Sequence, residues 1–180
     1  MLHTTLTHLD ISYAFCKNVS AVAVLTKLKH LNVSGNRLVS LPMIFSNLGT
    51  LQTLISDDNG HIFVDYCLQK MTTLTNLSLA KNPLAVLAPY IGNLVQLVSF
   101  NISQTQIRVL APECFKWSKL TTLNLTDSPC YCPPKCYHHD VSKAMNTLLQ
   151  ISEAFSNDEF RLLHEKILDF PGSVCYISDT

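Results

Sequence analysis

The residues with the clearest chemical potential lie in a short segment rich in cysteine and histidine. Cys130, Cys132 and Cys136 are followed closely by His138, and three thiolates with one imidazole match the ligand set of a tetrahedral zinc ion. The spacing differs from that of common zinc fingers, and two prolines between the cysteines stiffen the loop. We therefore expect the cysteines to be reduced thiols in a tight turn, with no metal or other cofactor bound. These four side chains are the candidate ligands of a zinc site.

Composition and motifs argue against catalysis and against nucleic-acid binding. The sequence has no Ser-His-Asp spacing signal, no phosphate-binding loop and no basic stripe. Hydrophobic residues make up 47% of the chain and charged residues 14%, which predicts a large core and a weakly charged surface. The net charge is zero, but residues 1–136 carry ten Lys+Arg against six Asp+Glu, and residues 137–180 carry three against seven. This change in the sign of the charge marks a boundary between two parts of the chain near residue 136.

The elements that position these side chains follow an internal repeat of the form L-x-x-L-x-L-x-x-N-x-L. Its first positions are separated by 22, 23, 23, 23 and 23 residues, and they are Leu6, Leu28, Leu51, Leu74, Leu97 and Leu120. A fixed period of this length is the signature of a solenoid. No single repeat can bury its own apolar side, so neighbouring repeats must stack to form one continuous core.

These segments resemble the leucine-rich repeat family over about residues 2–130, and their length is similar to that of the short typical or intracellular types. The resemblance implies an α/β solenoid with a curved parallel sheet on its concave face, an irregular or helical convex side and a C-terminal helical cap. It also implies a module that binds a protein partner without catalysis. The alternative is the regulatory or substrate-recruiting part of a larger enzyme or bacterial effector.

The bend after each strand is expected to be held by a short polar side chain that bonds backbone groups of adjacent repeats. Asn36, Asn59 and Asn82 supply an amide at this position. The other three bends have Ala14, Thr105 and Ser128 instead. We therefore expect the ladder of bonds to be strongest in the middle of the solenoid.

A partner would contact the variable positions of the strands, which point into the concave face. These positions are mainly small and polar, and Tyr13 is the one Trp, Tyr or Arg among them, so we expect the end with Tyr13 and the two histidines to be the anchor. The candidate partner-binding residues are His8, Asp10, Tyr13, His30, Asn32, Ile55, Asp57, Asp58, Ser78, Asn101 and Asn124.

The third repeat departs from the pattern because Ser56 and His61 stand where leucines are expected. One explanation is a loosened repeat in which Ile62 or Phe63 fills the gap. Another is a polar notch on the binding side, and a metal site formed by His61 with the two preceding aspartates is a third.

Two domains are predicted: residues 1–136 as about six repeats, and residues 137–180 as a helical hairpin that caps them. Val141, Ala144, Met145 and Leu148 recur at helical spacing. A capping box at 156–159 opens a second helix with an apolar face formed by Phe160, Leu163, Ile167 and Phe170. The Cys-x-Cys pair also resembles the C-terminal cap of extracellular repeat proteins, which would pair Cys130 and Cys132 with Cys136 and Cys175.

The N-terminal sequence leads to two further expectations, one about association at that end of the solenoid and one about the cellular compartment. Leu6 opens a repeat only five residues after Met1, which leaves no room for an N-terminal cap. We expect either a longer parent chain or end-to-end association with a second copy. No secretory signal and no membrane-spanning run are seen, which predicts a cytoplasmic protein, or an extracellular one if the chain is a fragment.

Overall fold

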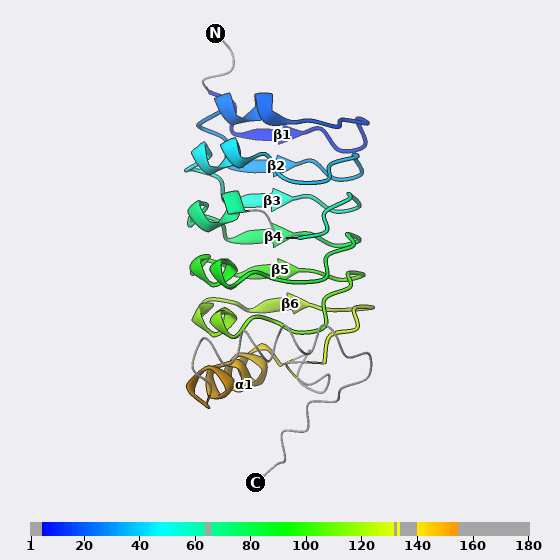
Figure 1. Cartoon of the computed structure of the whole chain (residues 1–180). Helices are drawn as coiled ribbons and strands as arrows, with labels where there is room; N and C mark the ends of the chain where they lie inside the picture. Colours follow the sequence, from blue (N-terminus) through cyan, green and yellow to red (C-terminus); the bar gives the residue numbers. More distant parts are fainter. Residues whose placement is uncertain (1–4, 64–65, 132, 134–139, 155–180) are drawn as a thin grey trace.

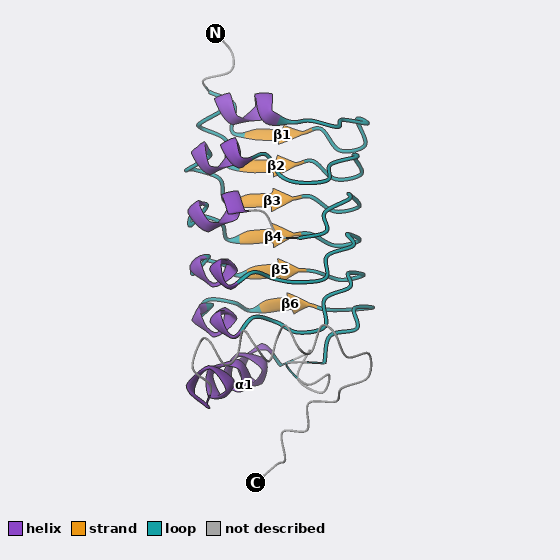
Figure 2. Cartoon of the chain, viewed as in Figure 1, coloured by secondary structure: helices purple, strands orange, loops and turns teal. Residues whose placement is uncertain are grey.

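The computed structural model describes residues 5–63, 66–131, 133 and 140–154. Within these residues the chain forms six short strands, β1 (His8–Asp10), β2 (His30–Asn32), β3 (Thr53–Ile55), β4 (Asn76–Ser78), β5 (Ser99–Asn101) and β6 (Thr122–Asn124). A 3-10 helix follows each of the first five: η2 (Ser20–Val24), η3 (Met43–Asn47), η4 (Tyr66–Lys70), η5 (Pro89–Asn93) and η6 (Pro112–Lys116). The α-helix α1 (Val141–Ala154) comes last. The strands and the 3-10 helices form two parallel columns (Figures 1 and 2).

The strands form one parallel sheet in which the order in space equals the order in the chain. Leu9 lies beside Leu31, and this register continues through the central residue of each strand to Leu123. Successive side chains of a strand point to opposite faces, so the central residue enters the core while its two neighbours point outward. The sequence prediction of an α/β leucine-rich repeat solenoid is confirmed.

The return segments use short 3-10 turns, and proline helps to start three of them. Pro42 directly precedes η3, whereas Pro89 and Pro112 are the first residues of η5 and η6. Proline is well suited to a helix start because its φ is already fixed and its missing N–H is not needed there. Leu48 ends η3 by donating its N–H to the Phe45 carbonyl at 2.9 Å. A five-residue turn is short enough to fit inside a 23-residue repeat.

One apolar cluster runs the length of the solenoid. The first-position leucines of repeats two to six are all buried in it: Leu28, Leu51, Leu74, Leu97 and Leu120. Near the C-terminal end Trp117 packs edge-on against Phe100, with ring centroids 5.2 Å apart, and its Nε1 donates a hydrogen bond to the Ile91 carbonyl at 3.1 Å. Each fully buried leucine or aromatic side chain of this kind contributes about 1.5–3 kcal/mol.

The bend after each strand contains a residue in the left-handed region. Six residues share this conformation immediately before the bend position, with φ between 52° and 62°: Tyr13, Gly35, Asp58, Lys81, Gln104 and Asp127. For a residue other than glycine this conformation costs roughly 1–2 kcal/mol. In repeats two to six the residue that follows this conformation is buried or partly buried, whereas Ala14 of the first repeat is exposed.

The bend side chains form the expected ladder of hydrogen bonds. Asn82 Nδ2 donates to the carbonyls of Ser56, Leu79 and Ala80 at 2.9–3.1 Å, and its Oδ1 accepts the His61 N–H at 3.2 Å. Equivalent bonds surround Asn36 and Asn59. Each asparagine therefore joins its own bend to that of the preceding repeat.

Hydroxyl groups continue the ladder in the last two repeats, with fewer bonds. Thr105 Oγ1 donates to the Ile102 carbonyl at 2.8 Å, and Ser128 Oγ donates to the same carbonyl at 2.8 Å. The Thr105 N–H donates to Ser128 Oγ at 3.2 Å. A hydroxyl carries one donor where an amide carries two, so the ladder is densest at the three asparagines, as predicted.

Helix α1 packs against η6 at the C-terminal end of the solenoid. Asp140 opens the helix, since its Oδ1 accepts the Lys143 N–H at 3.1 Å. That hydrogen bond is the main reason why the pKa of Asp140 lies below its ordinary value. Ala144 and Leu148 are buried, which agrees with the predicted helical spacing. The second helix of the predicted hairpin lies outside the described residues.

None of the helices in the described ranges has both the length and the apolar character needed to cross a membrane.

The ladder leads to a first prediction. Asn82→Ala leaves three backbone carbonyls without their amide donor, and we expect it to lower the free energy of unfolding by about 3 kcal/mol. Urea denaturation followed by circular dichroism measures the loss. Asn76→Ala, at an exposed strand position, is the matched control and should change stability by less than about 0.5 kcal/mol. Equal losses in the two variants would contradict a structural role for the ladder.

Candidate functional site

The outward side chains of the six strands form an open surface, which we call the strand face. Its first row consists of His8, His30, Thr53, Asn76, Ser99 and Thr122, and its second row of Asp10, Asn32, Ile55, Ser78, Asn101 and Asn124. Eight of the eleven candidate binding residues lie in these rows. Asp57 follows β3 by two residues, and Tyr13 and Asp58 hold the left-handed position of their bends.

The first row begins with a pair of stacked imidazoles. The rings of His8 and His30 are nearly parallel, at 16°, with centroids 4.2 Å apart. Their stacking follows from the parallel register, which sets these two residues directly beside each other. Thr7 Oγ1 forms a 2.9 Å hydrogen bond with Nδ1 of His8. The pair offers a flat, partly polar platform at the N-terminal end of the strand face.

The side chains of the second row mainly accept hydrogen bonds from backbone N–H groups. Asn32, Asn101 and Asn124 each accept, through Oδ1, the N–H of the residue two positions later, at 3.0–3.2 Å. Asp10 does the same with Ser12 and also accepts the Ser12 hydroxyl. These bonds from Ser12, the hydroxyl first and the N–H second, hold the pKa of Asp10 below its ordinary value. The row therefore caps the C-terminal ends of the strands.

Where this row lacks a capping group, a neighbouring repeat supplies it. Ile55 has no polar atom to offer, and the Asp57 N–H instead donates to Ser34 Oγ at 3.1 Å. Asp57 Oδ1 in turn accepts both the Ala80 N–H, at 2.8 Å, and the Ser78 hydroxyl, at 2.6 Å. Asp57 thus serves the structure of the next repeat, a role that the sequence pattern did not reveal.

Neighbouring caps are also joined to one another. Asn32 Nδ2 donates to Asp10 Oδ2 at 3.1 Å, and Asn101 Nδ2 donates to Ser78 Oγ at 3.0 Å. These donors would have to leave existing partners before they could bond a ligand. The first row, rather than the second, has the side chains that are most available for contact.

An aromatic tip extends the strand face at its N-terminal end. Tyr13 and Phe15 are both largely exposed and both have a positive φ, which is a rare conformation for bulky residues. The Tyr13 ring lies over Gly35, where a Cβ would come within 2.2 Å of ring atoms. The guanidinium of Arg37 lies 5.7 Å from the centroid of Phe15. Sequence analysis missed Phe15 and Arg37 as candidates: Phe15 lies two residues after Tyr13 in the chain, which was a signal, whereas Arg37 comes from the next repeat.

The structure of the irregular third repeat agrees with none of the three explanations drawn from the sequence. Ser56 and His61 are fully buried, and Ser56 Oγ shares a 2.8 Å hydrogen bond with Nε2 of His61. Ile62 and Phe63 are more than half exposed, so the prediction that either fills the gap is wrong. The pair is not a notch on the strand face either, because both side chains occupy the leucine positions inside the core.

The buried pair has the separation of a nucleophile and its base, but it is sealed from solvent. Burial lowers the pKa of His61 to about 4, and a backbone interaction with Val39 partly opposes this effect. Nδ1 of His61 makes no hydrogen bond to the residues that the structure describes. The imidazole therefore stays neutral at physiological pH and replaces a leucine as a core side chain.

The cysteine segment is described only in part. Cys130 is buried, whereas Cys132, Cys136 and His138 lie outside the described residues, as does Cys175. Cys114 is a buried thiol, and burial raises its pKa well above the ordinary value. Among the described positions, no three His, Cys, Asp or Glu side chains are grouped so that they could hold a metal ion.

The chain is similar both to a protein-family model and to several solved structures. The family model "Leucine Rich Repeat" matches residues 27–48. Among solved structures, an internalin (inlF) from Listeria monocytogenes is 21% identical with a TM-score of 0.62, covering 69% of this chain and 36% of its own. A leucine-rich repeat protein from Leptospira interrogans is 24% identical with a TM-score of 0.70, covering 79% and 36%.

A third similar structure is the ectodomain of the Arabidopsis thaliana membrane receptor kinase GASSHO1/SCHENGEN3, in complex with CASPARIAN STRIP INTEGRITY FACTOR 2. It is 28% identical with a TM-score of 0.59 and covers 68% of this chain and 16% of its own. Comparison with curated protein sequences gives no significant match. The chain spans about a third of the length of the two bacterial structures.

The repeat register, the parallel sheet and the matching family model define the class of molecule. The chain is a leucine-rich repeat protein. Proteins of this fold are generally modules for protein–protein interaction rather than catalysts.

The buried histidine leads to a second prediction. Because the pKa of His61 falls from 6.5 to about 4 on folding, the unfolded chain binds more protons between these values. Stability is therefore full above about pH 6.5 and falls as the pH drops toward 4, by about 3 kcal/mol in total. Urea denaturation at half-unit pH steps measures this slope.

His61→Leu should remove most of that slope whatever its effect on stability at pH 7, since leucine does not titrate. His30→Leu, a change at the partly exposed strand face, is the matched control and should keep the slope. If His61→Leu retained the full acid sensitivity between pH 6.5 and 4, our account of the buried pair would be wrong.

Proposed function

We propose that this chain is a non-catalytic module that binds a protein partner at the N-terminal part of the strand face. The observation that carries the proposal is the contrast within that face. His8, His30 and the aromatic tip present rings to solvent, while the second row is bonded to backbone and to its own neighbours.

The type of contact follows from the available side chains. Tyr and Arg are enriched among residues that dominate binding energy, and here both come together with Phe15 and two imidazoles at one end. Toward the C-terminal end the first row contains short residues, Ser99 and Thr122 among them. A partner therefore anchors at the first two repeats and lies along the remaining first row through weaker polar contacts.

The alternative function is a recruiting or regulatory part of a larger enzyme or effector. The length of the similar bacterial structures supports it, since each is much longer than the part that this chain matches. Mass measurement of the native protein from its source would distinguish the two, because a catalytic domain adds mass to the same polypeptide.

We also propose a cytoplasmic location. Cys16 and Cys114 are free thiols, which is typical of a reducing compartment. Labelling of thiols in intact cells with and without permeabilisation would test this location.

The anchor leads to a third prediction. We expect His8→Ala/His30→Ala to weaken partner capture at least about tenfold, and Tyr13→Ala to have a similar effect, because these rings form the exposed platform. Affinity capture from an extract of the source organism, followed by quantitative mass spectrometry, measures the change. Asp57 is avoided as a test position because its carboxylate supports the backbone of repeat four.

Asn47→Ala/Lys70→Ala, which changes two exposed residues of the 3-10 helices, is the matched control and should retain every partner. Retention of all partners by both anchor variants would show that the strand face is not the binding surface.

A further inference from the structure

The end of the solenoid at β1 has apolar side chains that the next repeats cover but that here stay partly open. Four residues of the first repeat are exposed or only partly buried: Leu6, Leu9, Ile11 and Leu25. The residues at the matching positions of the second repeat are at most 1% exposed: Leu28, Leu31, Val33 and Leu48. The difference arises because, within the described residues, the first repeat has a neighbouring strand on one side only. A terminal repeat with an open core requires a cover.

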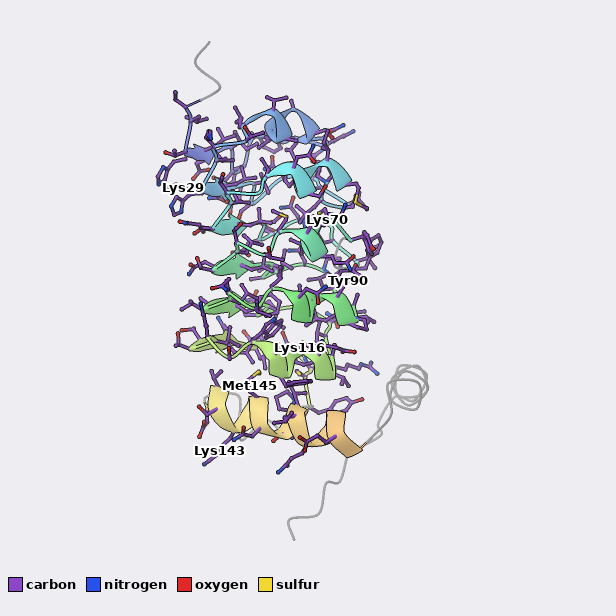
Figure 3. The ribbon with its side chains drawn as sticks, turned by 90° about the vertical axis from the view of Figure 1, so that its left-hand side faces the viewer. Lys29, Lys70, Tyr90, Lys116, Lys143 and Met145 are labelled. Carbon is purple, nitrogen blue, oxygen red and sulfur yellow. The ribbon has the colours of Figure 1, made fainter. Side chains whose placement is uncertain are left out.

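The opposite end of the solenoid is closed by α1. Leu120 and Leu123 of the last repeat are 8% and 7% exposed, and α1 packs against η6. Met145 lies on the side of α1 that faces the solenoid, and Lys143 lies on the side that faces away (Figure 3). A head-to-tail contact between two copies would have to displace this helix. In the described chain the β1 end is therefore the one that is open to stacking.

The same end has backbone groups that point away from the sheet. The Thr7 carbonyl accepts two N–H groups of the second repeat at 2.8 and 3.0 Å, and the Ile11 N–H donates to one of its carbonyls at 2.9 Å. Backbone groups alternate in direction along a strand, so those of His8 and Asp10 face away from β2. Among the described residues β2 is the one strand neighbour of β1. This edge is a template for an added strand.

We propose that a second copy of the chain covers this end through antiparallel pairing of the two β1 strands. A twofold axis at Leu9 sets His8 of each copy opposite Asp10 of the other. Two opposed residues whose backbone groups face each other exchange both N–H···O bonds in an antiparallel pair. The two such pairs therefore satisfy the outward backbone groups of both strands, and the interface is the same patch on each copy.

The side chains select this register. With the axis at Leu9, the imidazole of one copy lies beside the carboxylate of the other, and opposite charges in such pairs are favourable. Moving the axis to Asp10 would oppose two carboxylates, and moving it to His8 would leave both imidazoles without an acidic neighbour. The two Leu9 side chains meet at the axis, which covers the central residue of β1 as its neighbours cover Leu31. Charge and apolar burial thus favour a second copy as the occupant.

The association joins two sheets into one. Residues directly opposite in an antiparallel pair point to the same face, so the strand faces of the two copies form one continuous surface. The stacked pair of His8 and His30 in each copy then lies next to that of the other, at the centre of this surface. The contact concerns the free protein and does not rest on the proposed partner.

Sedimentation velocity of the full chain over a dilution series tests the contact, and we expect a reversible equilibrium between one chain and two. His8→Pro removes an N–H that faces away from β2, and proline is tolerated on such an edge. We expect this variant to raise the dimer Kd at least about tenfold, because one hydrogen bond of each pair is lost. Val39→Asp/Ile62→Asp changes two exposed apolar residues of the return segments and should dimerise like the parent.

Charge variants test the register and keep every backbone N–H, which covers the case in which His8→Pro does not fold. His8→Asp sets two carboxylates opposite each other and should raise the dimer Kd about fivefold relative to His8→Asn, which loses the same ring without adding charge. Adding Asp10→Asn to His8→Asp should restore most of the affinity. Asparagine is compatible with that position, since Asn32 and Asn101 form the same cap in other repeats. Circular dichroism checks that each variant is folded.

Three results would overturn the proposal. The first is a parent that sediments as a single chain at every concentration. The second is a dimer that Val39→Asp/Ile62→Asp abolishes while folded variants of His8 retain it, which would place the interface on the return segments. The third is an equal Kd for His8→Asp and His8→Asn, since His8 would then not lie opposite Asp10 of the second copy.

Discussion

The structure depends on the stacking of repeats that cannot bury their own apolar sides. Leu31, Leu54 and Leu77 are each buried only because the repeats before and after cover them. Stacking must bring backbone polar groups inside together with the leucines, and a buried carbonyl without a donor is costly. The bend residues meet that requirement, since each asparagine amide bonds carbonyls of two consecutive repeats. Apolar burial and the ladder are therefore two parts of one constraint.

The same constraint explains which parts of the fold the sequence predicts. The position of a leucine in the repeat determines whether it faces the core, so the strands, their parallel order and the role of Asn36, Asn59 and Asn82 follow from spacing. Helix α1 also follows, because its buried residues recur at a helical period. The residues 155–180 and most of the cysteine segment lie outside the described chain, and the predictions made for them stay predictions.

The sequence predicts where the candidate site lies, but not which of its side chains serve the structure of neighbouring repeats. The register places all eight strand residues on one face, as expected. What spacing cannot reveal is how a neighbour compensates for an exception: Ser34 caps the strand of Ile55, and Asp57 caps the next one. Ser56 and His61 likewise seemed to break the core pattern, but their mutual hydrogen bond allows both to remain inside. Such pairings depend on the side chain opposite, which a one-dimensional pattern does not contain.

The ladder also connects the proposed anchor to a residue that no partner would touch. The bend of the first repeat has Ala14 and no amide of its own, so Asn36 holds it from the second repeat, donating to the Ile11 carbonyl and accepting the Cys16 N–H. Tyr13 and Phe15 lie between these two bonds. The orientation of the aromatic tip is thus set from outside its own repeat. Natural variation at Asn36 would alter recognition while leaving every contact residue unchanged.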